Sequence, residues 1–158
     1  LVYSINTNPD SRRLMVSAWA PHEMNDMVLP PCHYAFQVYI NNGVMDLMWQ
    51  QRSADVFLGL PYDITMYGLL LEMLAKGANL KAGQLIGQLG DCHLYNNHLE
   101  QAKIYLDRPK RVLPKLELKD SVWFDTVIKK VHIPTADKIK LLKYNPLPAI
   151  KADLSVGN

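Results

Sequence analysis

The strongest constraint on the fold is a hairpin signal, Asn41-Asn42-Gly43, between two segments of strand-like sequence. An Asn-Gly pair favours the tight turn that joins antiparallel strands, because both residues tolerate a positive φ. Residues 33–40 before the turn alternate large apolar side chains, and residues 45–51 after it form a second such segment. Pro30-Pro31 directly upstream excludes a helix there. The sequence therefore predicts a β-hairpin whose first strand starts just after two prolines.

A cysteine and a histidine, Cys32 and His33, occupy the start of that first strand. A thiol is nucleophilic only as its thiolate, which nearby positive charge stabilises. Arg12, Arg13 and Arg52 lie in polar motifs and could supply this charge. The alternative interpretation of Cys32 is a small buried side chain without chemistry.

Length and composition favour a single domain. A chain of 158 residues with 49% hydrophobic content can bury one core. The formal net charge is +2 and the basic residues are dispersed, so the basic stripe of a nucleic-acid-binding surface is absent. No apolar run approaches the roughly 18 residues of a membrane-spanning helix. The two cysteines make no disulfide framework, and we expect a reducing, cytoplasmic setting.

The longest predicted helix follows Gly59-Leu60-Pro61-Tyr62 and runs from Asp63 to about Lys76. Its apolar residues form one broad stripe, which predicts a core helix; they are Ile64, Met66, Tyr67, Leu70, Leu71 and Leu74. Further strands are predicted at 84–89, 115–118 and 139–144. This mixture of strands and helices indicates an α+β fold.

A series of motifs follows in order along the chain: Asp10-Ser11-Arg12-Arg13, Trp19-Ala20-Pro21, Leu29-Pro30-Pro31-Cys32-His33, Gln51-Arg52-Ser53-Ala54-Asp55, Gly59-Leu60-Pro61-Tyr62-Asp63 and Gly90-Asp91-Cys92-His93-Leu94-Tyr95. Each motif is weak alone, but the ordered series closely resembles the thymidylate synthase family. The resemblance implies a three-layer fold, with a mixed sheet packed on a long buried helix and a dimer formed through the sheet. It also implies that residues 1–158 form one thymidylate synthase-like domain that lacks the family's N-terminal portion.

The resemblance implies a one-carbon transferase that acts through a covalent adduct between Cys32 and a pyrimidine ring. The substrate would be a 2′-deoxynucleotide 5′-monophosphate, and 5,10-methylenetetrahydrofolate would donate the carbon to C5. Implied catalytic residues are Cys32, Arg52 and Asp63. Implied nucleotide contacts are Arg12, Arg13, Gln51, Arg52, Ser53, Asp63, His93, Tyr95 and Tyr144. Implied folate contacts are Asp55, Leu58, Gly59 and Val156.

Several of these residues have specific implied roles. Arg12 and Arg13 would cross the dimer interface to bind the phosphate in the partner's site, since a guanidinium binds phosphate bidentately. Arg52 would also keep Cys32 ionised. Asp55 would accept hydrogen bonds from the pterin ring, and its alternative interpretation is a helix cap.

Asp63 departs from the family pattern, in which an asparagine occupies this position. An ionised carboxylate only accepts hydrogen bonds, which suits the amino group of cytosine and not O4 of uracil. A carboxylate facing O4 would cost on the order of 1–3 kcal/mol. This residue resembles the deoxycytidylate hydroxymethylase branch, so we expect dCMP as substrate, with a 5-hydroxymethylated or methylated product. The alternative is that Asp63 only caps the helix and that the protein is an ordinary thymidylate synthase converting dUMP to dTMP.

Two further alternatives remain. The chain could be a non-catalytic fragment. It could also be a metal-binding module built on Cys92, His93 and His98, but their spacing fits no common set of metal ligands, and no metal is expected.

Overall fold

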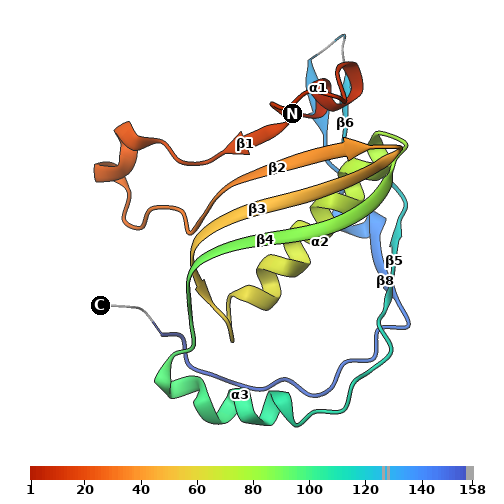
Figure 1. The fold of residues 1–158 in the computed structure, drawn as a ribbon. Helices are drawn as coiled ribbons and strands as arrows, with labels where there is room; N and C mark the ends of the chain where they lie inside the picture. The colour runs from red at the N-terminus through yellow and green to blue at the C-terminus, as the bar shows by residue number, and fades with distance from the viewer. Residues whose placement is uncertain (126, 128, 156–158) are drawn as a thin grey trace.

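The computed structural model describes residues 1–125, 127 and 129–155. Its main layer is a four-stranded sheet in the order β1-β2-β3-β4 (Figure 1). The strands are β1 (Met15–Ser17), β2 (His33–Asn41), β3 (Val44–Asp55) and β4 (Lys81–His93). β1, β2 and β3 pair antiparallel, whereas β4 runs parallel to β3 after the crossover helix α2 (Leu60–Gly77). The predicted mixed sheet is confirmed.

The predicted hairpin joins β2 to β3. Asn42 and Gly43 have φ values of 49° and 77°, the positive angles that a tight hairpin turn requires. β3 and β4 are longer than predicted and reach Asp55 and His93. The extra length places polar motif residues inside the sheet, where strand pairing fixes their positions.

The core lies between β3 and α2. Met45, Leu47 and Trp49 alternate along β3, face the helix and are buried. They pack against the buried face of α2, formed by Tyr67, Leu71, Leu74 and Ala75. Burial of each large apolar side chain contributes about 1.5–3 kcal/mol, so this contact dominates the stability of the layer pair.

The predicted apolar stripe of α2 is only partly buried. Ile64 and Met66 are 47% and 44% exposed, so the interpretation of the whole stripe as core is wrong at the N-terminal half of the helix. The reason is that β5 (Lys115–Leu118) packs near the other end of α2, where Lys76 Nζ donates a hydrogen bond to the Leu118 carbonyl.

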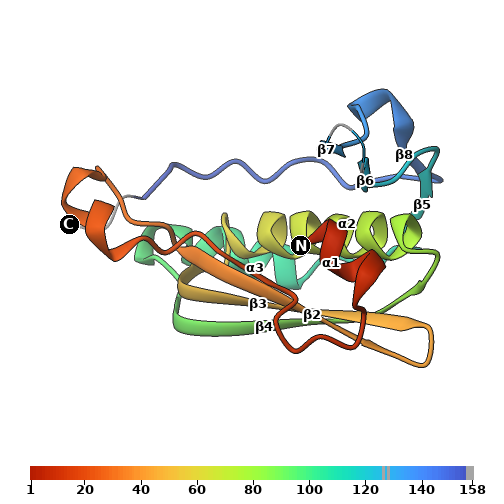
Figure 2. The ribbon, with the colours of Figure 1, turned by 90° about the horizontal axis from the view of Figure 1, so that it is seen from above.

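The C-terminal third of the chain forms a layer on the side of α2 opposite the sheet (Figure 2). There β5 pairs with β8 (Ile139–Leu142), and β6 (Trp123–Asp125) pairs with β7 (Lys130–His132). α1 (Val2–Thr7) meets β6 through an edge-to-face contact between Tyr3 and Phe124. α3 (Leu99–Leu106) follows β4 after a short 3₁₀ turn, η2 (Asn96–His98). The chain is thus α+β with helix α2 between two β layers.

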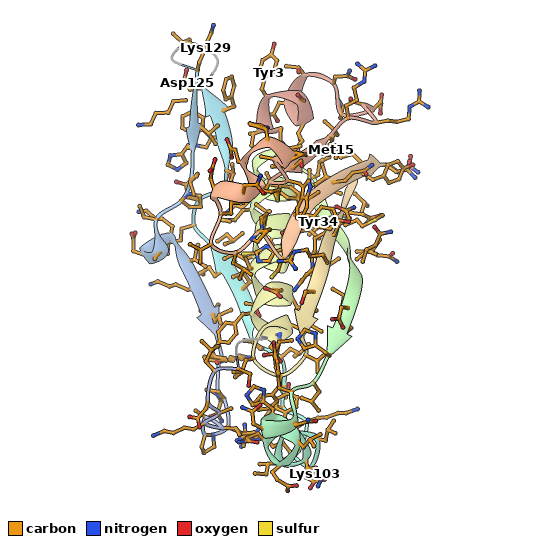
Figure 3. All side chains as sticks on the ribbon, turned by 90° about the vertical axis from the view of Figure 1, so that its left-hand side faces the viewer. Tyr3, Met15, Tyr34, Lys103, Asp125 and Lys129 are labelled. Carbon is orange, nitrogen blue, oxygen red and sulfur yellow. The ribbon has the colours of Figure 1, made fainter. Side chains whose placement is uncertain are left out.

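The face of the four-stranded sheet that points away from α2 carries exposed apolar side chains. Alternation along the strands places Met15, Tyr39 and Ile86 on it, and they are 52%, 61% and 38% exposed. Met15 and Tyr34 lie on neighbouring strands at the edge of this sheet (Figure 3). The expected dimer through the sheet stays a prediction.

Candidate active site

Strand pairing gathers the candidate site residues at one end of the sheet. In the β2–β3 pair His33 stands opposite Gln51, and in the β3–β4 pair Asp55 stands opposite His93. The turn after β3 leads directly into α2, so the first turn of the helix, with Asp63, lies at the same end. Residues that are 60 positions apart in the sequence, such as His33 and His93, therefore border one space.

That space is a cleft of about 360 Å³, within the range of small-molecule sites. Its lining residues are Cys32, His33, Gln51, Ser53, Asp55, Leu58, Gly59, Asp63, His93, Tyr95, Leu154 and Ser155. Most of the residues predicted to bind nucleotide or folate are in this set. The structure brings them together from β2, β3, α2, the end of β4 and the C-terminal tail.

Cys32 lies beside a cation that approaches from outside the cleft. Arg52 Nη2 is 3.8 Å from Cys32 Sγ. The same guanidinium donates to the carbonyls of Pro30 at 2.7 Å and Pro31 at 3.1 Å, and the Arg52 backbone N–H donates to the Cys32 carbonyl at 2.8 Å. The two prolines thus present their carbonyls to Arg52, which fixes its charge next to the sulfur.

Arg52 itself does not line the cleft. It borders a second hollow, of about 470 Å³, on the exposed side of the sheet, together with Trp19 and Tyr34. Arg52 thus lines the second hollow, while its guanidinium lies 3.8 Å from the sulfur of Cys32, which lines the cleft. Its predicted contact with the nucleotide phosphate stays a prediction.

A chain of hydrogen bonds orients Asp63. The indole N–H of Trp49 donates to Gln51 Oε1 at 3.0 Å, so the amide nitrogen of Gln51 must point the other way. Gln51 Nε2 then donates to Asp63 Oδ2 at 2.8 Å and to the Ser53 carbonyl at 2.9 Å. Gln51 is only 4% exposed and belongs to the alternating β3 residues that face α2, which is why it meets the helix.

The second oxygen of Asp63 faces a histidine. Asp63 Oδ1 is 3.9 Å from His33 Nε2, and His33 Nδ1 is 3.2 Å from the hydroxyl of Tyr67. Burial raises the pKa of Tyr67 above its usual value, and the negative charge of Asp63 raises it further. Tyr67 therefore stays neutral and can share a hydrogen bond with His33.

Asp63 does not cap α2. The residue at the N-cap is Gly59, and the helix start has no side-chain cap hydrogen bond. The Asp63 carboxylate is instead bonded to Gln51 on the neighbouring strand. The interpretation of Asp63 as merely a helix cap is therefore wrong.

The turn after β3 is held by Asp55. Its Oδ1 accepts from the backbone N–H groups of Phe57 at 2.9 Å and Leu58 at 3.3 Å. A Cβ on Gly59 would come within 3.1 Å of the Asp55 carbonyl, so glycine suits the close approach there. Asp55 therefore stabilises the turn before α2 and does not cap the helix, whose N-cap is Gly59, so the helix-cap interpretation of Asp55 is wrong. Asp55 also lines the cleft.

Comparison with known proteins identifies the family. The family model of thymidylate synthases matches residues 1–156. The chain belongs to the thymidylate synthase family. A thymidylate synthase from Listeria monocytogenes serotype 4a (strain HCC23) is 48% identical over 158 residues, which cover 99% of this chain and 48% of that protein. A thymidylate synthase from Listeria innocua serovar 6a (strain ATCC BAA-680 / CLIP 11262) is also 48% identical, with the same coverage. The chain spans about half the length of these curated relatives.

Some residues assigned by the family resemblance lie away from the cleft. Arg12 and Arg13 are exposed in the segment between α1 and β1, and Tyr144 is 59% exposed just after β8. None of the three lines the cleft. Val156 lies outside the described residues. His93 and Tyr95 do line it, and their rings meet edge to face with centroids 4.9 Å apart.

The structure places in or beside the site several residues to which the sequence assigned no catalytic or binding role. His33 and Tyr67 touch Asp63 or its partner, and Trp49 orients Gln51. Leu154 and Ser155 of the tail line the cleft. For His33, its position directly after Cys32 could have indicated a place in the site. The apolar pattern marks Trp49 and Tyr67 only as core residues.

Among the described residues, no group of three or more His, Cys, Asp or Glu side chains could hold a metal ion. No helix in that part of the chain has the length and apolar content needed to cross a membrane.

Proposed function

We propose that this protein transfers a one-carbon unit to C5 of dUMP and forms dTMP. The observation that carries the proposal is Cys32 Sγ at the border of a cleft, with Arg52 3.8 Å behind it and the bonded Asp63 carboxylate among the other lining groups. Membership of the thymidylate synthase family and the names of the relatives at 48% identity support it. The chain is thus interpreted as part of a transferase of nucleotide biosynthesis.

Cys32 is the nucleophile in this proposal. Its thiolate adds to C6 of the pyrimidine, which makes C5 electron-rich. C5 would then form a bond to the one-carbon unit as the bond from that carbon to the folate nitrogen breaks, and C5 would lose its proton. Reduction of the transferred carbon to a methyl group, with release of Sγ from C6, would restore the ring. Arg52 places its positive charge 3.8 Å from Sγ, next to the atom that attacks C6 and is later released from it. Gln51, held by Trp49, keeps Asp63 in place for the edge of the base.

The part of the cleft lined by Asp55, Leu58, Gly59 and Leu154 is here called the cosubstrate half and is proposed to bind 5,10-methylenetetrahydrofolate. When bound, this folate supplies the methylene carbon and the hydride that reduces it. Two backbone N–H groups of the turn donate to Asp55 Oδ1 and hold the carboxylate in place. In this position the carboxylate can accept from the adjacent N–H donors of a pterin edge. Leu58, Gly59 and Leu154 offer the apolar and close-approach surfaces that a flat ring needs.

The phosphate would be held by Ser53 and by arginines from two subunits. Arg12 and Arg13 lie outside the cleft of their own chain, as a role in the partner's site requires. The exposed apolar face of the sheet, with Met15 and Ile86, is the surface proposed for a homodimer. Mixing an inactive Cys32→Ser protein with an inactive Arg13→Ala protein should then restore about a quarter of the activity, because one of the sites in a mixed dimer is complete. No recovery on mixing contradicts the shared site.

Transfer to dCMP is the second candidate, because Asp63 is an acceptor-only side chain when ionised. Gln51 Nε2 donates to Asp63 Oδ2, so this carboxylate oxygen acts as an acceptor in the structure. The family comparisons favour dUMP, since the relatives are named thymidylate synthases, and the expected preference for dCMP has no support from them. A product with a hydroxymethyl group belongs to this second candidate.

Tritium release from C5 separates the two candidates. The purified protein is incubated with the folate and either [5-³H]dUMP or [5-³H]dCMP, and the product is identified by mass. Faster release from dUMP with dTMP as product supports the proposal. Faster release from dCMP supports the second candidate. Release from neither, together with no Cys32 adduct of 5-fluoro-dUMP, contradicts both and leaves the non-catalytic fragment.

A further inference from the structure

His98 is a fully buried polar residue that contacts elements from three walls of the cleft without lining the cleft itself. Its exposed fraction is 0%. It belongs to η2, between the end of β4 and α3. Such complete burial of an imidazole is costly unless its polar atoms are used, so its contacts indicate what it does.

The first contact holds the C-terminal tail. His98 Nε2 lies 2.7 Å from the carbonyl oxygen of Asp153. A carbonyl only accepts, so Nε2 carries a proton and donates it to this hydrogen bond. Nδ1 has no hydrogen-bond partner among the described residues. Among the described residues, the imidazole therefore makes its one hydrogen bond to the tail.

Two neighbouring contacts fasten the same tail. Ser155 Oγ donates to Asn97 Oδ1 at 2.7 Å, and Arg108 Nη2 donates to the Pro148 carbonyl at 2.6 Å. Residues 148–155 thus run along η2 and α3, as the tail does beside α3 in Figure 1. Among these contacts only the one from His98 is made by a fully buried side chain. It sits directly before Leu154 and Ser155, the tail residues that line the cleft.

The other contacts of His98 reach the remaining walls. Its ring lies 5.4 Å from the ring of Phe57 in the turn that carries Leu58, and 5.9 Å from the ring of Tyr95. Leu58 and Tyr95 line the cleft. The imidazole of His98 therefore contacts the tail, the turn after β3 and Tyr95, which follows the end of β4.

We propose that His98 is a positioning residue that seats the tail over the cosubstrate half of the cleft through its hydrogen bond to Asp153. The identity of the ligand there, a reduced folate, rests on the proposed function. The candidate base-reading residue Asp63 accepts from Gln51, which in turn accepts from Trp49, and none of these bonds involves His98. Loss of the His98 hydrogen bond should therefore weaken folate use and leave the binding of dUMP unchanged.

A pair of substitutions isolates the hydrogen bond. His98→Phe keeps a ring against Phe57 and Tyr95 but has no donor, whereas His98→Gln places an amide N–H close to the position of Nε2. Lys103→Gln is the control, because Lys103 is an exposed residue of α3 that pairs with Glu100. It lies at one end of the molecule (Figure 3). Thermal unfolding of each variant establishes that it is folded.

The first readout is hydrogen exchange of the amides of residues 150–155 in the ligand-free protein. We expect about fivefold faster exchange in His98→Phe, the effect of losing one hydrogen bond, and wild-type exchange in His98→Gln and Lys103→Gln. The second readout is kinetic, with KM for the folate raised about fivefold in His98→Phe and Kd for dUMP unchanged. Deleting the chain from Lys151 onward should abolish the difference in KM between the His98 protein and its His98→Phe variant, because the two changes act on one interaction.

The outcomes separate this inference from the proposed function. Unchanged exchange in a folded His98→Phe protein overturns the seating role, as does a His98→Gln protein that behaves like His98→Phe. Faster exchange with unchanged KM for the folate overturns the link to the cosubstrate. If the protein turns over no nucleotide at all, the proposed function fails while the exchange readout still decides whether His98 seats the tail.

Discussion

Gln51 on β3 donates a 2.8 Å hydrogen bond to Asp63 on the first turn of α2. This bond joins the sheet to the crossover helix at the border of the cleft, so the position of a candidate base-reading side chain depends on the packing of the two layers. Trp49 completes the arrangement, because its indole N–H determines which end of the Gln51 amide faces the helix.

Substitution of Asp63 by asparagine should shift base preference toward uracil. An asparagine amide can donate to O4, where a carboxylate presents only acceptors. Removing an acceptor–acceptor contact is worth about 1–3 kcal/mol, so the ratio of Kd for dUMP to Kd for dCMP should fall by roughly tenfold. Isothermal titration with both nucleotides measures the ratio. Glu72→Gln, on the other end of α2, is the control, and an unchanged ratio in Asp63→Asn contradicts a base-reading role.

Cys32→Ser should abolish the covalent adduct with 5-fluoro-dUMP and the folate, because a serine hydroxyl is far less nucleophilic than a thiolate. Intact-protein mass spectrometry detects the adduct. Cys92, the other cysteine, is exposed on β4 and does not line the cleft, so Cys92→Ser is the matched control and should form the adduct normally. An adduct on the Cys32→Ser protein would falsify the assignment of the nucleophile.

Trp49→Phe should destabilise the fold. The ring would still stack on Tyr67, whose centroid is 5.3 Å away, but Gln51 Oε1 would lose its donor in a buried position. A buried acceptor without a partner costs about 1–3 kcal/mol in the free energy of unfolding, which urea denaturation measures. Trp19→Phe is the comparison, since Trp19 is 40% exposed and should change stability by less than about 0.5 kcal/mol.

Tyr67 should make the folded protein sensitive to alkali. Its pKa is raised by burial and by Asp63, so the folded state binds the phenolic proton more tightly than the unfolded chain does. The corresponding stability is fully present below the usual value of 10.0 and is lost as pH rises through the raised pKa. Unfolding measured between about pH 8 and 11 should show a steeper alkaline loss in the wild type than in Tyr67→Phe.

Asp63→Asn gives a second view of the same coupling. Without the carboxylate charge, the pKa of Tyr67 should move back toward its usual value while the contribution of burial remains. Tyrosinate absorbance, with Tyr67→Phe used to identify the signal, follows this change. An identical titration of Tyr67 in both proteins contradicts the coupling.

Local chemistry accounts for the parts of the fold that the sequence predicted. The turn at Asn42-Gly43 needs positive φ, and alternation along residues 45–51 places one side of β3 in the core, so hairpin and strands could be located without coordinates. Most of the residues that line the cleft were identified by the family resemblance of the ordered motifs and not by local chemistry. The extent of burial on α2 was not predictable, because it depends on where β5 packs.

Sequence alone determined the hairpin, the long helix after Gly59-Leu60-Pro61, the family and the candidate nucleophile Cys32, because each depends on neighbouring residues or on an ordered set of motifs. Only the tertiary structure decided that Asp63 is bonded to Gln51 and not to the helix start, and that His98 holds the tail at Asp153. These contacts join residues 12 and 55 positions apart. Their geometry is set by how the layers pack, and no local preference of the chain encodes it.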